Sequence, residues 1–167
     1  MRVYDLYTTY THMYTYIEIQ MIRHTFLLCH TCTYTYVIAQ NTSSVSKICL
    51  GCICEAASGC NTTLGCNGDV CGPFRITWAY WADAGKPTLN NEANTNEGAY
   101  ANCVNDAFCA GRTVEGYMNK FARDCNGDGV INCDDFIRIH RNGRNACTTP
   151  LNSKYENIYK LCMQTFG

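Results

Sequence analysis

The clearest alternation of apolar and polar residues runs through "GPFRITWAYW", residues 72–81. In an extended chain Phe74, Ile76, Trp78 and Tyr80 fall on one side, and the residues between them fall on the other. Aromatic and β-branched residues dominate the run, as they do in strands. The pattern therefore predicts a β-strand, followed by an Asn-rich loop around "TLNNEANTNEG".

Helical spacing of apolar residues begins after this loop. "AYANCVNDAFCAG" places Tyr100, Cys103 and Ala107 on one face, which predicts a helix. "TVEGYMNKFARD" shows the same spacing, and Thr113 is the expected N-cap of a second helix.

Two further helices complete the chain. "DDFIRIHRNG" is expected to open at Asp134 and Asp135 and to close at Gly143, a residue type common just past helix ends. "SKYENIYKLCMQTF" is expected to form a last amphipathic helix. The fold class that follows is α+β, mostly helical with one small sheet.

Cysteine is the most unusual feature of the composition. The 167 residues include 14 cysteines, a share that is typical of disulfide scaffolds. Small secreted domains use such bridges because their cores are small, so an oxidising compartment follows. A zinc protein is the disfavoured alternative, because no second cysteine pair lies at a finger-like distance. Twelve cysteines, an even number, fall in the C-terminal part and can form up to six bridges: Cys49, Cys52, Cys54, Cys60, Cys66, Cys71, Cys103, Cys109, Cys125, Cys133, Cys147 and Cys162.

Residues 1–39 differ from the rest of the chain. A Thr- and Tyr-rich run precedes Met21, where we expect translation to start, and an apolar stretch then ends at Ala39. Small or apolar residues before Gln40 fit the rule for signal-peptide cleavage, which predicts a secreted, extracellular protein beginning at residue 40. The alternative is a genuine N-terminal extension. Residues 40–167 are expected to form one domain.

The formal net charge of −1 excludes a strong electrostatic attraction to nucleic acid or to anionic membranes. No run of residues is long and apolar enough to span a bilayer. Any glycan partner must therefore be held by shape, stacking and hydrogen bonds.

Four stretches, read in order, resemble one family. "CLGCICEAASGC", "DVCGPFRITWAYW", "YMNKFARDC" and "CDDFIRIHRNG" are similar to the invertebrate-type lysozymes, also called the destabilase family. The likeness runs from about Ile48 to Cys162. It implies a lysozyme-like fold, with helices around a small β-hairpin and a glycan cleft between them. The implied reaction is hydrolysis of the β-1,4 bond after N-acetylmuramic acid in bacterial peptidoglycan (a muramidase), in defence or digestion, by a monomer that requires no cofactor.

Glycoside hydrolysis needs a protonated carboxyl group and an ionised one on either side of the bond. The family places its acid immediately before a Ser-Gly pair, where this chain has Ala57, and Glu55 stands two residues earlier. Two residues turn a helix by about 200°, so Glu55 is expected to point away from the acid's place. The family's second carboxylate matches Asp69, for which a turn residue is the alternative.

Two hypotheses about function remain open from these residues. Either Glu55 and Asp69 carry out a displaced version of the hydrolysis, or the chain is a weak or inactive peptidoglycan-binding or immune-recognition module. The resemblance also places Thr77 where an isopeptidase would carry a lysine, so isopeptidase activity is not expected. Trp78, Tyr80 and His140 are the candidate sugar-binding residues, although each of these residue types is common in purely structural roles.

The stretch "DCNGDGVINCDD" matches the twelve-residue calcium-loop pattern. A structural calcium ion is therefore a candidate, and a calcium-stabilised interaction domain is a third functional hypothesis. A disulfide that involves Cys125 and Cys133 is the alternative clamp for the loop. The ligands would be oxygens of Asp124, Asn126, Asp128, Val130 (carbonyl), Asn132 and Asp135.

Overall fold

The computed structural model describes residues 45–167. The predicted N-terminal extension and signal peptide lie outside the described residues, as do Cys29 and Cys32, and those expectations remain predictions. The elements in chain order are α2 (Lys47–Ser58), β1 (Cys66–Asn67), β2 (Val70–Cys71), β3 (Ile76–Thr77), α3 (Trp78–Asp83), α4 (Ala99–Asn105), α5 (Ala107–Phe121), α6 (Cys133–Asn142) and α7 (Ser153–Phe166).

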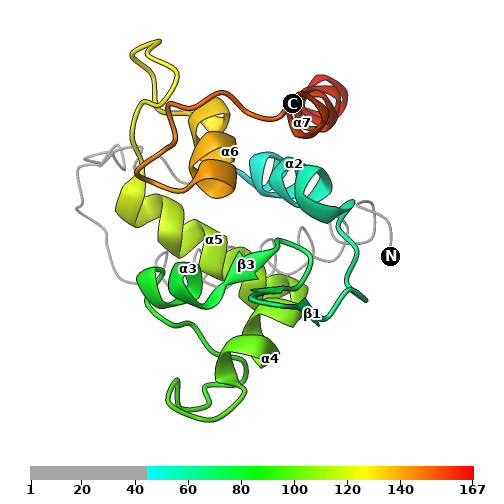
Figure 1. The fold of residues 1–167 in the computed structure, drawn as a ribbon, viewed down its shortest axis with the longest axis vertical. Helices are drawn as coiled ribbons and strands as arrows, with labels where there is room; N and C mark the ends of the chain where they lie inside the picture. The colour runs from blue at the N-terminus through cyan, green and yellow to red at the C-terminus, as the bar shows by residue number, and fades with distance from the viewer. Residues whose placement is uncertain (1–44) are drawn as a thin grey trace, which may run out of the picture. The chain divides into compact units, whose positions relative to one another are not determined.

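Helix α2 lies against α7 and contacts α6 and α5 (Figure 1). Its first turn is capped by the Ser46 side chain, whose oxygen accepts a hydrogen bond from the Cys49 amide at 3.1 Å. It ends at Gly59, which adopts a left-handed conformation with φ of 65°. The buried face of α2 includes Ile53, and a disulfide between Cys52 and Cys162 ties the helix to α7.

The sheet has three antiparallel strands in the order β1-β2-β3, each of two residues. The predicted strand over residues 72–81 is confirmed only at Ile76 and Thr77, because residues 72–75 form a turn and α3 begins at Trp78. Val70 pairs with Thr77 and no partner strand extends further. The Thr77 hydroxyl accepts a hydrogen bond from the Tyr80 amide at 3.2 Å and so caps the new helix.

The helix predicted over 99–111 is broken at Asp106. The Asp106 carboxylate accepts hydrogen bonds from the Phe108 and Cys109 amides and caps α5. The predicted N-cap at Thr113 is therefore wrong. Thr113 is fully buried inside α5, where its hydroxyl donates to the Cys109 carbonyl. The predicted helices that became α6 and α7 are confirmed, as is the loop between α3 and α4.

The twelve predicted cysteines form six disulfides, which confirms the disulfide-rich α+β fold. Cys125 and Cys133 both lie in bridges but do not pair with each other, so each ties one end of their loop to a different element. The pairs are Cys49–Cys133, Cys52–Cys162, Cys54–Cys60, Cys66–Cys71, Cys103–Cys109 and Cys125–Cys147.

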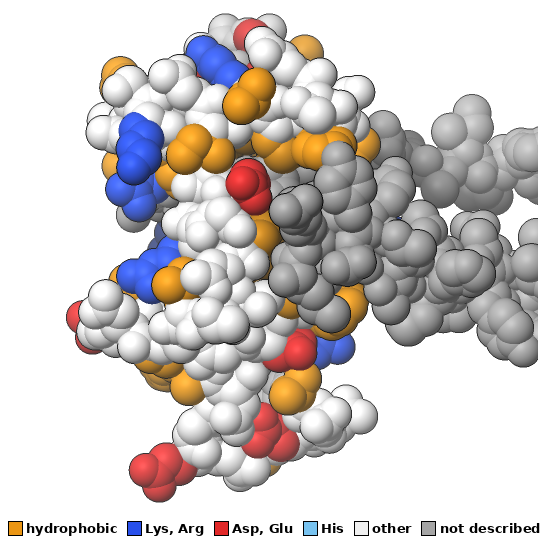
Figure 2. Space-filling view, turned by 90° about the vertical axis from the view of Figure 1, so that its right-hand side faces the viewer, with side chains coloured by type: hydrophobic (Ala, Val, Ile, Leu, Met, Phe, Trp, Pro, Cys, Tyr) orange, Lys and Arg blue, Asp and Glu red, His pale blue; other side chains and the backbone are white. Residues whose placement is uncertain are grey.

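The single core between these elements holds Ile53, Ile76, Val104, Met118 and Ile139, each almost fully buried. Among residues 45–167, no helix has the length and apolar character that a membrane crossing requires. On the face drawn in Figure 2, acidic and basic side chains lie scattered among uncharged and apolar ones, and neither sign forms a continuous patch.

Candidate functional site

A cavity of about 330 Å³ lies beside the C-terminal end of α2. Its lining comes from α2, the turn before β3, β3 itself, and helices α3, α5, α6 and α7. Three of the lining residues, Ala57, Thr77 and His140, occupy positions to which the family resemblance assigned a role. Residues far apart in the sequence therefore converge on one cavity, which we take as the candidate site.

Ala57 presents only a methyl group to this cavity. Glu55, on the same helix, is half-buried and is not part of the lining. Two residues correspond to about 200° of helical rotation, which accounts for the different directions of the two side chains. A catalytic role for Glu55 stays a prediction from the sequence.

Asp69 lies outside the lining as well. It is exposed in the two-residue turn that joins β1 to β2. Its backbone carbonyl accepts a hydrogen bond of 3.3 Å from the Tyr100 hydroxyl. The two carboxylates expected from the sequence are thus both absent from the cavity wall.

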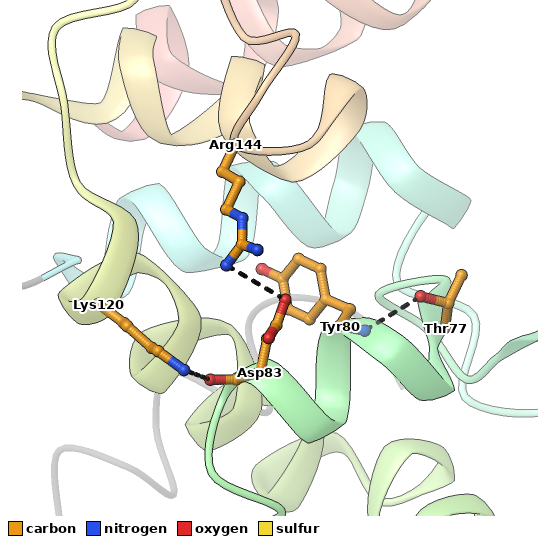
Figure 3. Close-up of polar contacts among 5 residues, drawn as sticks. All are labelled: Thr77, Tyr80, Asp83, Lys120 and Arg144. Carbon is orange, nitrogen blue, oxygen red and sulfur yellow. Dashed lines mark hydrogen bonds and ion pairs between the residues drawn. The ribbon is translucent and has the colours of Figure 1, made fainter.

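Asp83 is the one carboxylate among the lining residues of this cavity. It forms an ion pair with Arg144, with 3.5 Å between Oδ2 and Nη1, and its backbone carbonyl accepts a hydrogen bond from Lys120 (Figure 3). Asp83 was not among the candidates from the sequence, because a strand was predicted over residues 72–81 in place of the helix α3 that carries it. Helical spacing of Thr77, Tyr80 and Asp83 would have placed all three on one face.

His140 and Tyr80 form a hydrogen-bonded pair in the cavity wall. The His140 Nε2 lies 2.9 Å from the Phe74 carbonyl oxygen, and a carbonyl can only accept, so Nε2 carries the proton. Nδ1 therefore accepts from the Tyr80 hydroxyl at 3.1 Å. The Tyr80 ring also stacks on Tyr117, with 3.7 Å between ring centroids.

Burial is the main cause that lowers the pKa of His140 to about 4, and the nearby Arg141 lowers it further, while the hydrogen bond to the Phe74 carbonyl opposes both. Burial likewise raises the pKa of Tyr80 well above 10, so its hydroxyl keeps the proton that it donates to His140. His140 is therefore neutral at pH 7, and both of its ring nitrogens are already engaged. A ligand in the cavity can contact the imidazole ring but finds neither ring nitrogen free for a hydrogen bond.

Trp78 is 56% exposed and does not line the cavity, although its neighbours Thr77 and Ala79 do. The ammonium group of Lys86 lies 5.5 Å from the centroid of the Trp78 ring. Of the three candidate sugar-binding residues, the structure brings Tyr80 and His140 together and leaves Trp78 apart.

The loop over residues 124–135 is closed by a buried carboxylate. Asp135 is fully buried, and its Oδ1 accepts hydrogen bonds from the Cys125 and Asn126 amides, while its Oδ2 accepts one from the Asn132 amide. Asp124 similarly binds the amides of Gly127 and Gly129. Backbone amides therefore already bind the carboxylate oxygens of Asp124 and Asp135 that would coordinate the ion under the calcium hypothesis.

Within residues 45–167, no group of three or more His, Cys, Asp or Glu side chains is arranged to hold a metal ion. The donor set of the loop therefore does not fit calcium as it stands, because the closing carboxylate would first have to leave its amides. The contacts of Asp135 therefore disfavour the calcium site that the sequence predicts.

Comparison with known proteins finds a matching family model and several proteins of similar sequence. The family model described as destabilase matches residues 46–162. Invertebrate-type lysozyme 3 of Caenorhabditis elegans is 38% identical over 121 residues, which cover 70% of this chain and 86% of that protein. A lysozyme of Magallana gigas is 35% identical over 119 residues, covering 68% and 77% of the two chains.

Solved structures agree with the sequence matches. The lysozyme of Tapes japonica superposes with a TM-score of 0.53 at 32% identity, covering 74% of this chain and 92% of that one. A crystal structure of Aeromonas hydrophila PliI in complex with Meretrix lusoria lysozyme matches with a TM-score of 0.57 at 31% identity, covering 70% and 89% of the chains.

Proposed function

This chain belongs to the destabilase family of invertebrate-type lysozymes, and we propose that it binds bacterial peptidoglycan in the cavity beside Ala57 with little or no hydrolysis. The relatives that it resembles are named lysozymes, which supports a peptidoglycan ligand. The observation that carries the loss of hydrolysis is the methyl group of Ala57 in the cavity wall.

A methyl group cannot donate a proton to the leaving oxygen of a glycoside. General-acid help of this kind contributes about 10² to 10⁴ in rate, so its loss leaves at most a slow reaction. Asp83, the carboxylate that does line the cavity, is engaged by Arg144 and comes from a different element. The cavity keeps polar and aromatic side chains, Thr77, Tyr80 and His140 among them, that can contact a sugar.

Hydrolysis by Glu55 and Asp69 is the second candidate function, and the names of the relatives favour it. It requires the two carboxyl groups to face one bond at a separation on the order of 5 to 9 Å. Neither side chain belongs to the lining of the cavity, so a rearrangement of both α2 and the β1–β2 turn would be needed.

Isopeptidase activity finds no support in the site. Thr77 stands in the cavity where that activity would need a lysine, and its hydroxyl caps α3. Six disulfides are typical of extracellular proteins, and they support secretion as part of the proposal. We further propose that the protein acts as a monomer.

Sedimentation with insoluble peptidoglycan tests the binding directly. The disulfide-bonded protein is mixed with purified Gram-positive peptidoglycan or with cellulose as an insoluble control, and the supernatants are compared after centrifugation. We expect depletion by peptidoglycan and not by cellulose. Equal amounts left in both supernatants would overturn the proposed function.

A further inference from the structure

We propose that the cavity binds a carboxylate group of its ligand through Arg75, so that the site prefers anionic peptidoglycan fragments over neutral sugars. The inference rests on the proposed function, whose ligand it specifies. Three observations carry it: the turn on which Arg75 stands, the balance of charge in the cavity, and the chemistry of the guanidinium group.

The turn over residues 72–75 is held at the carbonyls of its first three residues. The Gly72 carbonyl accepts from the Arg75 amide at 3.1 Å. The Pro73 carbonyl accepts from the Ser58 hydroxyl at 2.6 Å, and the Phe74 carbonyl accepts from His140. Helices α2 and α6 thereby fix the backbone that leads to Arg75.

Gly72 fixes the other side of this turn. A Cβ atom at Gly72 would lie 1.7 Å from the Val104 carbonyl oxygen, so the turn sits directly on α4. Arg75 itself has a φ of 56°, a left-handed backbone conformation that residues other than glycine rarely adopt. Such strain persists where the surrounding structure enforces it and is concentrated at functional sites. Here it places an arginine in the cavity wall.

The charges in the cavity do not balance. Arg75 and Arg141 both line it, whereas Asp83 is the one lining carboxylate. Among the described residues, Asp83 pairs with Arg144 and Glu156 pairs with Lys160, and neither cavity arginine takes part in these ion pairs.

Each cavity arginine has a distinct environment. The Arg141 guanidinium lies over the Tyr155 ring, 5.2 Å from its centroid, whereas Arg75 has no aromatic ring stacked on it among the described residues. Ala57 adds no negative charge to the wall. Arg75 is therefore the cation best placed to receive an anion from a ligand.

A guanidinium group binds a carboxylate through two parallel hydrogen bonds, which gives both affinity and orientation. Peptidoglycan offers carboxylates from two sources. One is the lactyl group of muramic acid where it carries no peptide, and the other is the stem peptide. Oligomers of N-acetylglucosamine offer none, so they serve as the neutral comparison.

Calorimetric titration with three probes tests the proposal. N-acetylmuramic acid presents the lactyl carboxylate, muramyl dipeptide presents a carboxylate on its peptide, and diacetylchitobiose is neutral. The proteins are wild type, Arg75→Gln, Arg75→Lys and the matched control Arg123→Gln, whose arginine is exposed outside the cavity. Circular dichroism checks that each variant is folded.

We expect wild type to bind at least one anionic probe tighter than diacetylchitobiose by about tenfold or more, the effect of one charge-assisted hydrogen-bonded pair. The probe that binds identifies the source of the carboxylate. Arg75→Gln should lose this preference, Arg75→Lys should keep part of it, and Arg123→Gln should keep all of it.

An unchanged preference in Arg75→Gln, or equal binding of neutral and anionic probes by wild type, would overturn the inference. Should Arg75→Gln not fold, an undiminished preference in Arg75→Lys would overturn it instead. Sedimentation separates the two proposals. If the protein sediments with peptidoglycan, also as Arg75→Gln, but binds anionic and neutral probes equally, only the inference is refuted. If probe binding depends on Arg75 but the protein does not sediment with peptidoglycan, only the proposed function is refuted.

Discussion

Ala57 at the end of α2 and Arg75 on the turn before β3 line the same cavity. A proton donor is expected at the first position in an active member of the family, and this chain offers a methyl group there and a cation at the second. In the function that we propose, this pair makes the cavity better suited to holding a ligand than to hydrolysing it.

Replacing Ala57 with glutamate is expected to raise the hydrolytic rate. The new carboxyl group would enter the cavity, and a general acid contributes about 10² to 10⁴ in rate. Because Asp69 lies outside the lining, we expect a gain near the lower end of that range. Release of reducing sugar from peptidoglycan measures the rate. Ala57→Gln, which has the same size but no acidic proton, is the control and should show no gain; an equal rate in both variants would contradict the account.

His140 makes stability depend on pH. Its pKa in the folded protein is about 4, below the ordinary value of 6.5, so the unfolded chain binds more protons between these values. The contribution of neutral His140 to the free energy of unfolding is complete above pH 6.5 and is lost as the pH falls towards 4. Over that window the loss is on the order of 3 kcal/mol.

Urea unfolding of wild type and His140→Gln, at several pH values between 4 and 7, measures this dependence. The variant should be less stable at pH 7, because it loses the ring's hydrogen bonds to Phe74 and Tyr80, and its stability should vary less with pH. Parallel pH profiles for the two proteins would show that another group causes the dependence.

The disulfides are expected to differ in their contribution to stability according to the loop that each closes. Cys52–Cys162 spans 110 residues of sequence, and Cys54–Cys60 spans 6. Loop entropy predicts that removing the first pair costs about 2 to 3 kcal/mol more than removing the second. Urea unfolding of the two double serine variants gives the difference, and a greater loss from the short loop would be evidence against the entropic explanation.

Calcium and a chelator are both expected to leave the midpoint of thermal unfolding unchanged. The Asp135 carboxylate already binds three backbone amides, so the loop is closed without an ion. Asp135→Asn should instead lower the midpoint, because an amide group cannot accept all of these bonds equally well. A saturable rise of the wild-type midpoint with added calcium would restore the ion as a part of the protein.

The family and the fold class could be predicted from the sequence, because cysteine spacing and short motifs identify both. The course of α3 could not. Alternation over residues 72–81 resembles a strand, and only the Thr77 cap and the lack of a longer partner strand reveal the helix. Because α3 was not predicted, Asp83 was not identified as a candidate, although α3 places it in the cavity wall.

The break at Asp106 and the disulfide pairing also lay beyond the sequence. Asp106 interrupts a continuous apolar period by capping α5, and a cap can be recognised only once the turn is known. Cys125 and Cys133 stand close in the sequence but bond to Cys147 and Cys49, since tertiary packing decides which sulfurs meet. The residue types of the loop match the calcium pattern, but the sequence does not reveal that the Asp135 carboxylate binds backbone amides instead.

The most direct test of the central claim combines two assays on one preparation. Wild type, Glu55→Gln and the Tapes japonica lysozyme are compared for clearing of a Gram-positive cell-wall suspension and for sedimentation with peptidoglycan. We expect wild type to sediment but to clear about a hundredfold or more slowly than that lysozyme, and Glu55→Gln to behave as wild type does. Clearing at a comparable rate that disappears in Glu55→Gln would contradict the claim and establish Glu55 as the acid.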